Sequence, residues 1–152
     1  MEKALLLVSA FIVQILKLMK KILLIEDEFY ILDLYRIILE KAGFEVLLAE
    51  DGEKGYNLAQ NLPNLILLDI MLPKMNGIIL LKKLKEEDLT KNIPVVLLSN
   101  LGQEEVIKTA FDSGASGYFL KVRLSPDELV KKVNIFIENP NFKMDHKTLV
   151  FD

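Results

Sequence analysis

Five polar residues that can carry or stabilise charge directly follow apolar runs of the chain. They are Glu26 and Asp27 after ILLI, Asp69 after LILL, Ser99 after VVLL, and Lys121 after YFL. Three carboxylates brought close together repel one another unless a cation neutralises them. Because the ligand atoms on offer are oxygens, a hard ion such as Mg2+ is the expected metal.

The expected metal site leaves room for a phosphate. Mg2+ keeps several waters and usually takes one or two protein carboxylates, so we expect Asp27 and Asp69 as direct ligands and Glu26 as a ligand through water. Lys121 adds a second positive charge, and the Ser99 hydroxyl offers a hydrogen bond to a phosphoryl oxygen. This set of groups suits transfer of a phosphoryl group to an aspartate.

A parallel sheet would place these residues at one edge. Five short apolar runs alternate with stretches of helical period. The runs lie at 22–25, 44–49, 65–68, 93–98 and 118–120, and helices are expected near 29–42, 52–62, 77–88, 103–113 and 126–138. Continuous apolar runs are typical of strands buried on both faces, and the crossovers are long enough to return the chain parallel to itself. The pattern predicts an α/β fold of (βα)5 type, whose ligands bind beyond the carboxyl ends of the strands.

Capping residues support these helix boundaries. The segment SPDE at 125–128 offers a serine N-cap followed by a proline at the first helical position. Asp51 is expected to cap the helix that follows it, while Gly43 and Gly114 are expected to end helices in a left-handed conformation. Asn76-Gly77 is a strong turn dipeptide in the loop after the phospho-acceptor candidate.

Composition and charge limit the class of protein. The chain has 152 residues, of which 51% are hydrophobic, which suits a single domain. With 19 basic and 22 acidic side chains the net charge is -3, so we expect no direct contact with nucleic acid. The absence of cysteine excludes disulfides and thiolate chemistry. The single histidine, His146, is expected to be solvated in a polar tail.

Residues 1–19 differ in character from the rest, because they contain an uncharged stretch of 13 residues. The preferred interpretation is that translation starts at Met19 and that the preceding residues are an upstream extension of the reading frame. A second is a membrane anchor with Lys17, Lys20 and Lys21 on the cytoplasmic side, although the stretch is short against the roughly 20 residues of a membrane span. A third is a helix packed on the domain or on a partner.

Four segments resemble the motifs of response regulator receiver domains of two-component signalling. KKILLIEDE is similar to the family's opening strand and acidic pair, LLDIMLPKMNG to its phospho-acceptor motif, VVLLS to its hydroxyl strand and GASGYFLK to its lysine strand. The resemblance covers residues 20–138 and leaves 139–152 as a short C-terminal tail. It implies a flavodoxin-like, doubly wound five-stranded parallel sheet of order 2-1-3-4-5, in a cytoplasmic receiver of the stand-alone type.

The resemblance also implies a role for each site residue. It implies that Glu26 and Asp27 are the magnesium acids, that Asp69 is both the phosphorylated nucleophile and a metal ligand, and that the Met71 carbonyl is a further metal ligand. Ser99 is implied to sense the phosphoryl group, and Lys121 to form an ion pair with it. Tyr118 is implied to be an aromatic switch that changes rotamer when the Ser99 hydroxyl moves. The implied partners are a sensor histidine kinase or a histidine phosphotransfer protein, and a downstream protein target. The domain would catalyse its own phosphorylation and dephosphorylation but would turn over no separate metabolite.

The implied output is a change in protein contacts. The responding face combines the helix at 103–113, the strand at 118–120 and the helix at 126–138, which together could also support a homodimer. A competing interpretation is a phosphate-independent interaction module on the same fold. An aspartyl phosphohydrolase lacks support, because Met71 stands where its second acid is expected.

The sequence departs from the family pattern near the lysine and the hydroxyl. Val122 follows Lys121 where the family usually has a proline after a cis bond, and a cis bond before a residue other than proline costs ~3 kcal/mol. We therefore expect a trans bond and a rearranged loop, which makes the reach of Lys121 uncertain. Asn100 stands where a small residue is common. Met71 and Leu101 are apolar where an attacking water would be oriented, so we expect a long-lived phosphoryl state.

Overall fold

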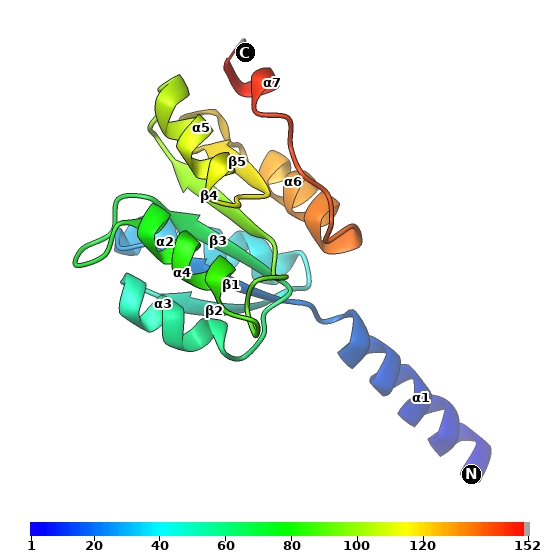
Figure 1. Ribbon diagram of the computed structural model, residues 1–152. Coiled ribbons are helices and arrows are strands. Elements are labelled where there is room, and N and C mark those ends of the chain that lie inside the picture. Colours follow the sequence, from blue (N-terminus) through cyan, green and yellow to red (C-terminus); the bar gives the residue numbers. More distant parts are fainter. Residues whose placement is uncertain (151–152) are drawn as a thin grey trace.

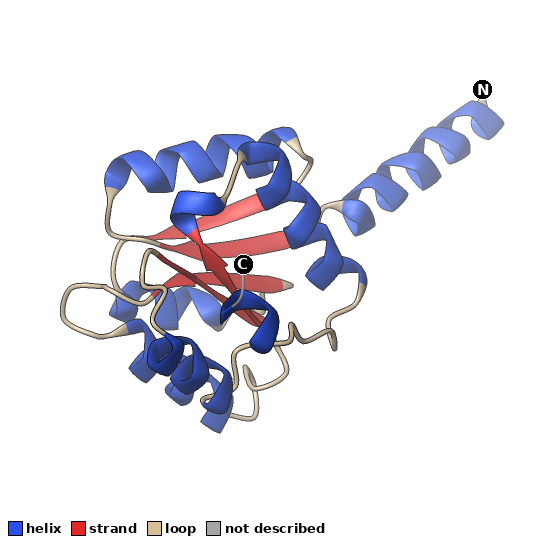
Figure 2. Cartoon of the chain, turned by 90° about the horizontal axis from the view of Figure 1, so that it is seen from above, coloured by secondary structure: helices blue, strands red, loops and turns tan. Residues whose placement is uncertain are grey.

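The computed structural model describes residues 1–150, apart from the side chains at positions 13, 14, 16–18, 148 and 150. Lys17, one of the three lysines of the expected anchor, has its side chain outside this described part. The fold contains one sheet and the helices that cover it (Figures 1 and 2).

Five parallel strands form the sheet in the order β2-β1-β3-β4-β5. Their bounds are β1 Lys21–Ile25, β2 Glu45–Ala49, β3 Leu65–Asp69, β4 Val95–Ser99 and β5 Gly117–Leu120. The predicted (βα)5 class and the strand order 2-1-3-4-5 are confirmed. β3 and β4 are buried along their whole length, as their unbroken apolar sequences predict.

Helices cover both faces of the sheet, as Figure 2 shows with the strands in red between blue helices. They are α2 Phe29–Lys41, α3 Gly52–Ala59, α4 Gly77–Glu86, α5 Glu104–Asp112 and α6 Pro126–Glu138. The core on one face combines strand residues with α2 and α6, and the core on the other face combines strand residues with α3, α4 and α5. Successive strand side chains alternate between these two cores, which fixes the register of each strand.

Most predicted helix boundaries are confirmed. The Asp51 carboxylate accepts a hydrogen bond from the Lys54 amide at 2.8 Å and caps α3, and Ser125 caps α6 through the Glu128 amide at 3.2 Å. Gly43 and Gly114 end helices with φ of 98° and 105°.

The interpretation of Asn76-Gly77 as a turn is wrong. Asn76 is the N-cap of α4, and its side chain accepts a hydrogen bond from the Ile78 amide at 2.7 Å. A Cβ atom added to Gly77 would lie 2.1 Å from the backbone oxygen of Asp69. The glycine is therefore needed because α4 begins in contact with the end of β3, which brings the helix close to the candidate nucleophile.

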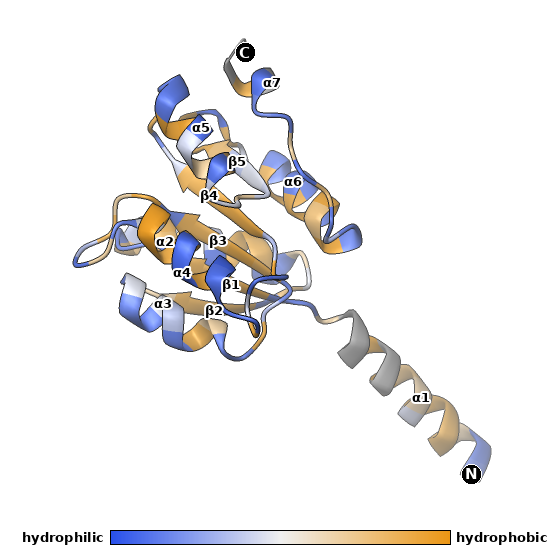
Figure 3. Ribbon diagram, viewed as in Figure 1, coloured by the Kyte–Doolittle hydropathy of each residue, from blue (hydrophilic) through white to orange (hydrophobic). Residues whose placement is uncertain are grey.

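An N-terminal helix, α1 (Glu2–Leu18), projects away from the layered domain in both views (Figures 1 and 2). It is mostly apolar in Figure 3, and Leu6, Leu7 and Phe11 are 69%, 71% and 63% exposed. In the part of the chain that the structure describes, no helix has the length and apolar character needed to cross a bilayer. The three interpretations of residues 1–19 therefore remain predictions.

The segment after α6 returns across the edge of the sheet and ends in the short helix α7 (Lys147–Val150), drawn in red beside α6 and α5 in Figure 1. The expectation of a solvated His146 is wrong, because the imidazole is half-buried and lies 5.9 Å from the Phe111 ring, centre to centre. The sequence did not predict this contact, because the half-buried side chains of the tail are separated by exposed polar ones and so form no apolar run.

Candidate functional site

The parallel register brings the predicted site residues to one edge of the sheet. Ile25 pairs with Leu68, so Glu26 and Asp69 follow neighbouring positions of β1 and β3. Ser99 ends β4 and pairs with Leu120. Lys121 therefore begins its turn beside the hydroxyl, and all five residues predicted from the strand ends lie at this edge.

Three carboxylates form the centre of the site. Ligand oxygens of Glu26, Asp27 and Asp69 all lie within 4.8 Å of one another. Glu26 is fully buried and Asp69 is 6% exposed, while Asp27 faces solvent. Carboxylate oxygens in one group, one of them open to water, fit the ligand preference of Mg2+, so these residues fit the expected metal.

Lys121 lies between the two buried acids. Its ammonium forms ion pairs with Oε2 of Glu26 and with Oδ2 of Asp69, the latter at 3.0 Å. The peptide bonds described in residues 1–150 include no cis bond, so the bond to Val122 is trans as expected. Lys121 begins a short 3-10 helix, Lys121–Arg123, and its ammonium contacts the aspartate.

Burial and charge shift the pKa values of this ion-paired group. Burial raises the pKa of Glu26 to about 7, because loss of hydration disfavours the carboxylate more than its hydrogen bond to Lys121 favours it. Burial lowers the pKa of Lys121, but the hydrogen bond to Glu26 and the charge of Asp69 outweigh burial, so the net pKa is raised. The lysine therefore stays charged while one buried acid titrates near neutral pH.

The remaining Asp69 oxygen faces a cleft. Oδ1 accepts a hydrogen bond from the Met71 amide at 3.2 Å, which orients the carboxylate. The cleft has a volume of about 240 Å3 and is lined by Asp27, Glu28, Asp69, Met71, Ser99, Asn100, Leu101 and Lys121. An acceptor carboxylate, a cation and a hydroxyl thus share one small opening, in which a phosphoryl group has polar contacts on several sides.

Leu101 connects the hydroxyl to the predicted switch aromatic. The Ser99 Oγ accepts a hydrogen bond from the Leu101 amide at 3.0 Å, and the Tyr118 hydroxyl donates to the Leu101 carbonyl at 2.5 Å. Tyr118 is fully buried in the core on the α5 side of the sheet. Burial raises the pKa of this tyrosine, which keeps its proton available for the bond.

Sequence reasoning named the Met71 carbonyl but missed the backbone groups of Glu28 and Leu101. The Glu28 amide donates to Oε1 of Glu26 at 3.1 Å, and both polar groups of the Leu101 backbone are used. Side-chain chemistry gives no signal for such roles, because any residue supplies the same amide and carbonyl.

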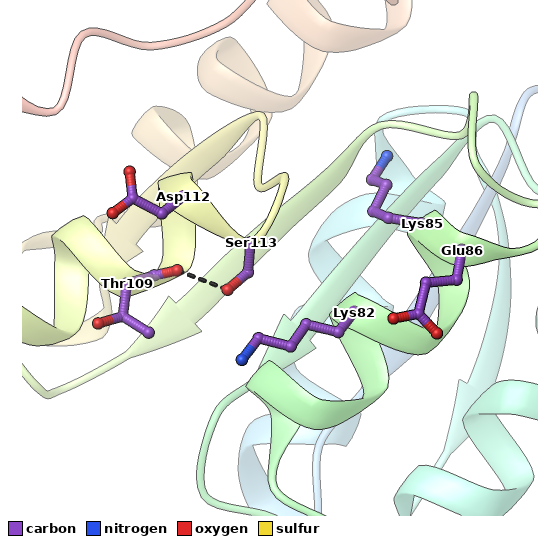
Figure 4. Close-up of a pocket in the computed structure, with 6 residues that line it drawn as sticks. All are labelled: Lys82, Lys85, Glu86, Thr109, Asp112 and Ser113. Atoms are coloured by element: carbon purple, nitrogen blue, oxygen red, sulfur yellow. Dashed lines mark hydrogen bonds between the residues drawn. The ribbon is translucent and has the colours of Figure 1, made fainter.

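A second hollow, of about 430 Å3, lies between α4 and α5, away from the acidic group (Figure 4). Its charged side chains point in different directions in the close-up, and the hydrogen bond drawn there joins Ser113 to the Thr109 carbonyl at 2.7 Å. The Lys85 ammonium bonds to the carbonyls of Lys91 and Ile93 at 3.1 and 2.6 Å. That lysine therefore stabilises the loop after α4 rather than a ligand.

Comparison with known proteins agrees with this geometry. The sequence profile of the response regulator receiver domain matches residues 22–134. The chain is 46% identical over 104 residues to the DNA-binding dual master transcriptional regulator RpaA of Synechocystis, a match that covers 68% of this chain and 43% of the relative. It is 42% identical over 115 residues to the phosphate regulon transcriptional regulatory protein PhoB of Escherichia coli, covering 75% and 50%. The chain thus spans about half the length of these relatives.

Solved structures show the same arrangement of elements. A putative response regulator from Chloroflexus aurantiacus superposes with a TM-score of 0.75 at 29% identity, covering 80% of this chain and 99% of that one. The chemotaxis protein CheY4 of Vibrio cholerae gives a TM-score of 0.73 at 27% identity, covering 77% and 98%.

Proposed function

Because the chain belongs to the family of response regulator receiver domains, we propose that it accepts a phosphoryl group on Asp69 in a Mg2+-dependent reaction and signals through changed protein contacts. The observation that carries this proposal is the position of the Asp69 carboxylate, 3.0 Å from the Lys121 ammonium at the base of a cleft. The cytoplasmic location expected for such a domain is part of the proposal.

In the proposed reaction the Asp69 carboxylate attacks phosphorus in a phosphohistidine of the donor. The new bond joins an aspartate oxygen to phosphorus, the phosphorus–nitrogen bond breaks, and its electron pair leaves with the imidazole, which takes up a proton. The Lys121 ammonium stabilises negative charge that gathers on the transferred oxygens. Ser99 donates its hydroxyl proton to one of those oxygens.

The acidic group would hold the metal. Glu26, Asp27 and Asp69, with the Met71 carbonyl implied by the family, are the proposed ligands. When bound, Mg2+ supplies positive charge to the phosphoryl oxygens and to the crowded carboxylates. The exposed Asp27 carboxylate gives the ion a route from solvent, because it lies at the open side of the group.

The proposed output begins at Ser99. A phosphoryl oxygen that draws the Ser99 hydroxyl away weakens its bond with the Leu101 amide, and Leu101 also holds the Tyr118 hydroxyl. Movement of Leu101 therefore changes the position of the segment that leads into α5 and the packing around β5. This is the face expected to meet a downstream protein or a second copy.

The proposed phosphodonor is a histidine kinase or phosphotransfer protein that docks beside the cleft. Phe29, Tyr30 and Val122 are 72%, 87% and 76% exposed, and each lies within two or three residues of a site residue in the sequence. A separate groove lies between α2 and α6, lined by Leu34, Ile37, Ile38, Lys41, Ala42, Pro126, Asp127 and Val130. An apolar rim next to the acceptor suits a partner that must bring a phosphohistidine to it.

The test is the response to phosphoramidate and to beryllium fluoride, a phosphoryl mimic. With Mg2+, intact-mass spectrometry should show one added phosphoryl group, and beryllium fluoride should produce a saturable change in tyrosine fluorescence. Asp69→Asn should abolish both effects, whereas Asp112→Asn, which alters an exposed acid of α5, should leave them intact. A saturable change that persists in Asp69→Asn would contradict the assignment.

A phosphate-independent interaction module on the same fold is the second candidate. The observation in its favour is Val122, which replaces the usual proline beside Lys121. The contact between Lys121 and Asp69 weighs against it, because the substitution has not removed the cation from the acceptor. In the presence of Mg2+, this candidate predicts no added mass with phosphoramidate and no change in tyrosine fluorescence with beryllium fluoride.

A further inference from the structure

The segment after α6 packs as an extra strand-like element at the open edge of β5. β5 is the last strand of the sheet, so one side of its backbone has no neighbouring strand. The Met144 amide donates to the Ser116 carbonyl at 2.9 Å, just before β5 begins. From Asn141 to Lys147 exposed and half-buried residues alternate, with the side chains of Phe142, Met144 and His146 turned inward. We call residues 139–150 the strap.

The strap contacts each element of the face formed by α5, β5 and α6. The Phe142 ring lies 5.4 Å from the ring of Phe136 on α6, and His146 packs on Phe111 of α5. A Cβ atom added to Gly117 in β5 would lie 2.9 Å from the Met144 sulfur. Glycine at this position therefore lets the strap lie directly against the strand.

The strap also joins the two cores. Phe142 and Met144 pack against the core on the α6 side, whereas Leu149 packs against the core on the α5 side. The chain therefore crosses the sheet edge from one face to the other. The strap therefore covers the open edge of β5 and apolar side chains beside it, which would otherwise be exposed.

We propose that the strap and a second copy of the chain compete for the face formed by α5, β5 and α6. This inference rests on the proposed function, in which that face is the place of pairing. A partner that packs against α5, β5 and α6 must contact surface that the strap already covers. This surface is the edge of β5 beside Met144 and the rings of Phe136 and Phe111, which contact Phe142 and His146. Strap docking and pairing are then mutually exclusive, and release of the strap exposes the pairing surface.

Charge on the same face suits a second copy of the chain. Glu104 and Glu105 are exposed at the start of α5, and Lys131 is exposed on α6. In a two-fold pair each α5 faces the partner's α6, so acids of one copy meet a lysine of the other. An acidic or basic macromolecule would instead require one sign of charge across the face.

The strap is also placed to respond to Asp69. Ser116 and Gly117, which it touches, directly precede the buried Tyr118, and Phe111 lies on the helix that follows Leu101. The hydrogen bond between Tyr118 and Leu101 therefore connects the phosphoryl cleft to the two places where the strap is held, the start of β5 and the α5 helix. A change in this hydrogen bond moves the surface on which the strap packs. Phosphorylation of Asp69 and docking of the strap therefore disfavour each other.

The experiment compares Met144→Asp with Asn141→Asp in the full chain. Both variants add one negative charge to the strap, but the first replaces a half-buried side chain and the second an exposed one. Hydrogen exchange at the amide of residue 144 reports docking, and sedimentation equilibrium with and without Mg2+ and beryllium fluoride reports pairing. If about nine chains in ten hold a docked strap, its release tightens pairing about a hundredfold, because both copies of a pair must release their straps.

The proposal expects Met144→Asp to lose amide protection and to pair about a hundredfold more tightly than the unaltered chain and Asn141→Asp, which should behave alike. If Met144→Asp keeps its protection, a double variant that adds Phe142→Asp removes the second apolar contact. A released strap with unchanged or weaker pairing overturns the proposal, as does a monomer in every state. Phosphoramidate labelling of the same variants tests the proposed function separately, because it requires neither the strap nor pairing.

Discussion

Lowering the pH is expected to stabilise the metal-free chain through Glu26. Burial raises the pKa of this carboxyl from 4.5 to about 7 in the folded state. A raised folded pKa means that the folded state binds more protons than the unfolded state between these two values. The stabilisation is complete below the unfolded pKa and is lost as the pH rises through the folded pKa, so stability falls between pH 4.5 and about 7.

The size of the effect follows from the same two pKa values. Each pKa unit corresponds to about 1.4 kcal/mol, so the full difference is about 3 kcal/mol, and about 2 kcal/mol of it lies between roughly pH 5.5 and pH 8. Urea unfolding in a chelating buffer at both pH values measures the difference directly.

Glu26→Gln removes the titrating group while it keeps the side-chain volume. We expect the free energy of unfolding of this variant to depend less on pH, by about 2 kcal/mol over the same interval. Glu53→Gln, at an exposed acid of α3, should keep the pH dependence of the unaltered chain. Equal pH dependence in the unaltered chain and Glu26→Gln would refute the assignment of a near-neutral pKa to this residue.

Three further substitutions test separate parts of the site. Lys121→Met leaves buried carboxylates without their cation and should lower the free energy of unfolding by about 3 kcal/mol near pH 8, measured in urea; a stability equal to that of the unaltered chain would contradict the ion pairs. Gly77→Ala places a Cβ atom 2.1 Å from the last carbonyl oxygen of β3 and should lower the free energy of unfolding by about 1–3 kcal/mol through overpacking. Gly102→Ala, whose Cβ atom would have its nearest neighbour 3.8 Å away, should have the free energy of unfolding of the unaltered chain. Met71→Asn gives the cleft a polar group that can orient water and should shorten the lifetime of the acyl phosphate, followed by loss of the phosphorylated intact mass; slower decay would contradict the expected long-lived state.

The fold followed from the sequence because its signals are local and agree with one another. Continuous runs such as LILL predict strands buried on both faces, and β3 is buried throughout. The capping residues Asp51 and Ser125 predicted where α3 and α6 begin, and the structure begins these helices there. The strand order came from resemblance rather than from residue patterns, since no local signal states which strands are neighbours.

The site was predictable to the extent that its groups are side chains at strand ends. Glu26, Asp69, Ser99 and Lys121 could be found because a polar residue after an apolar strand is conspicuous. The function of Gly77 could not, because the need for a missing Cβ atom depends on how closely α4 approaches β3. The strap could not be found either, since single apolar residues spaced by polar ones gave too weak a signal in 139–152.

The charges of the site explain why one lysine and one divalent ion would suffice in the proposed reaction. Three carboxylates and one ammonium leave two negative charges, which a divalent ion neutralises. In the metal-free chain burial raises the pKa of Glu26 to about 7, and the charge of Asp69 adds to this shift, so a proton on Glu26 relieves part of the negative charge near neutral pH. Phosphorylation neutralises the Asp69 carboxylate but adds up to about two negative charges on the phosphoryl group. In the proposed reaction the occupied site then carries about one surplus negative charge, which favours donation of the Ser99 hydroxyl proton to a phosphoryl oxygen. Because the Ser99 oxygen also accepts a hydrogen bond from the Leu101 amide, movement of this hydroxyl is the proposed step that links chemistry at Asp69 to the face that the strap covers.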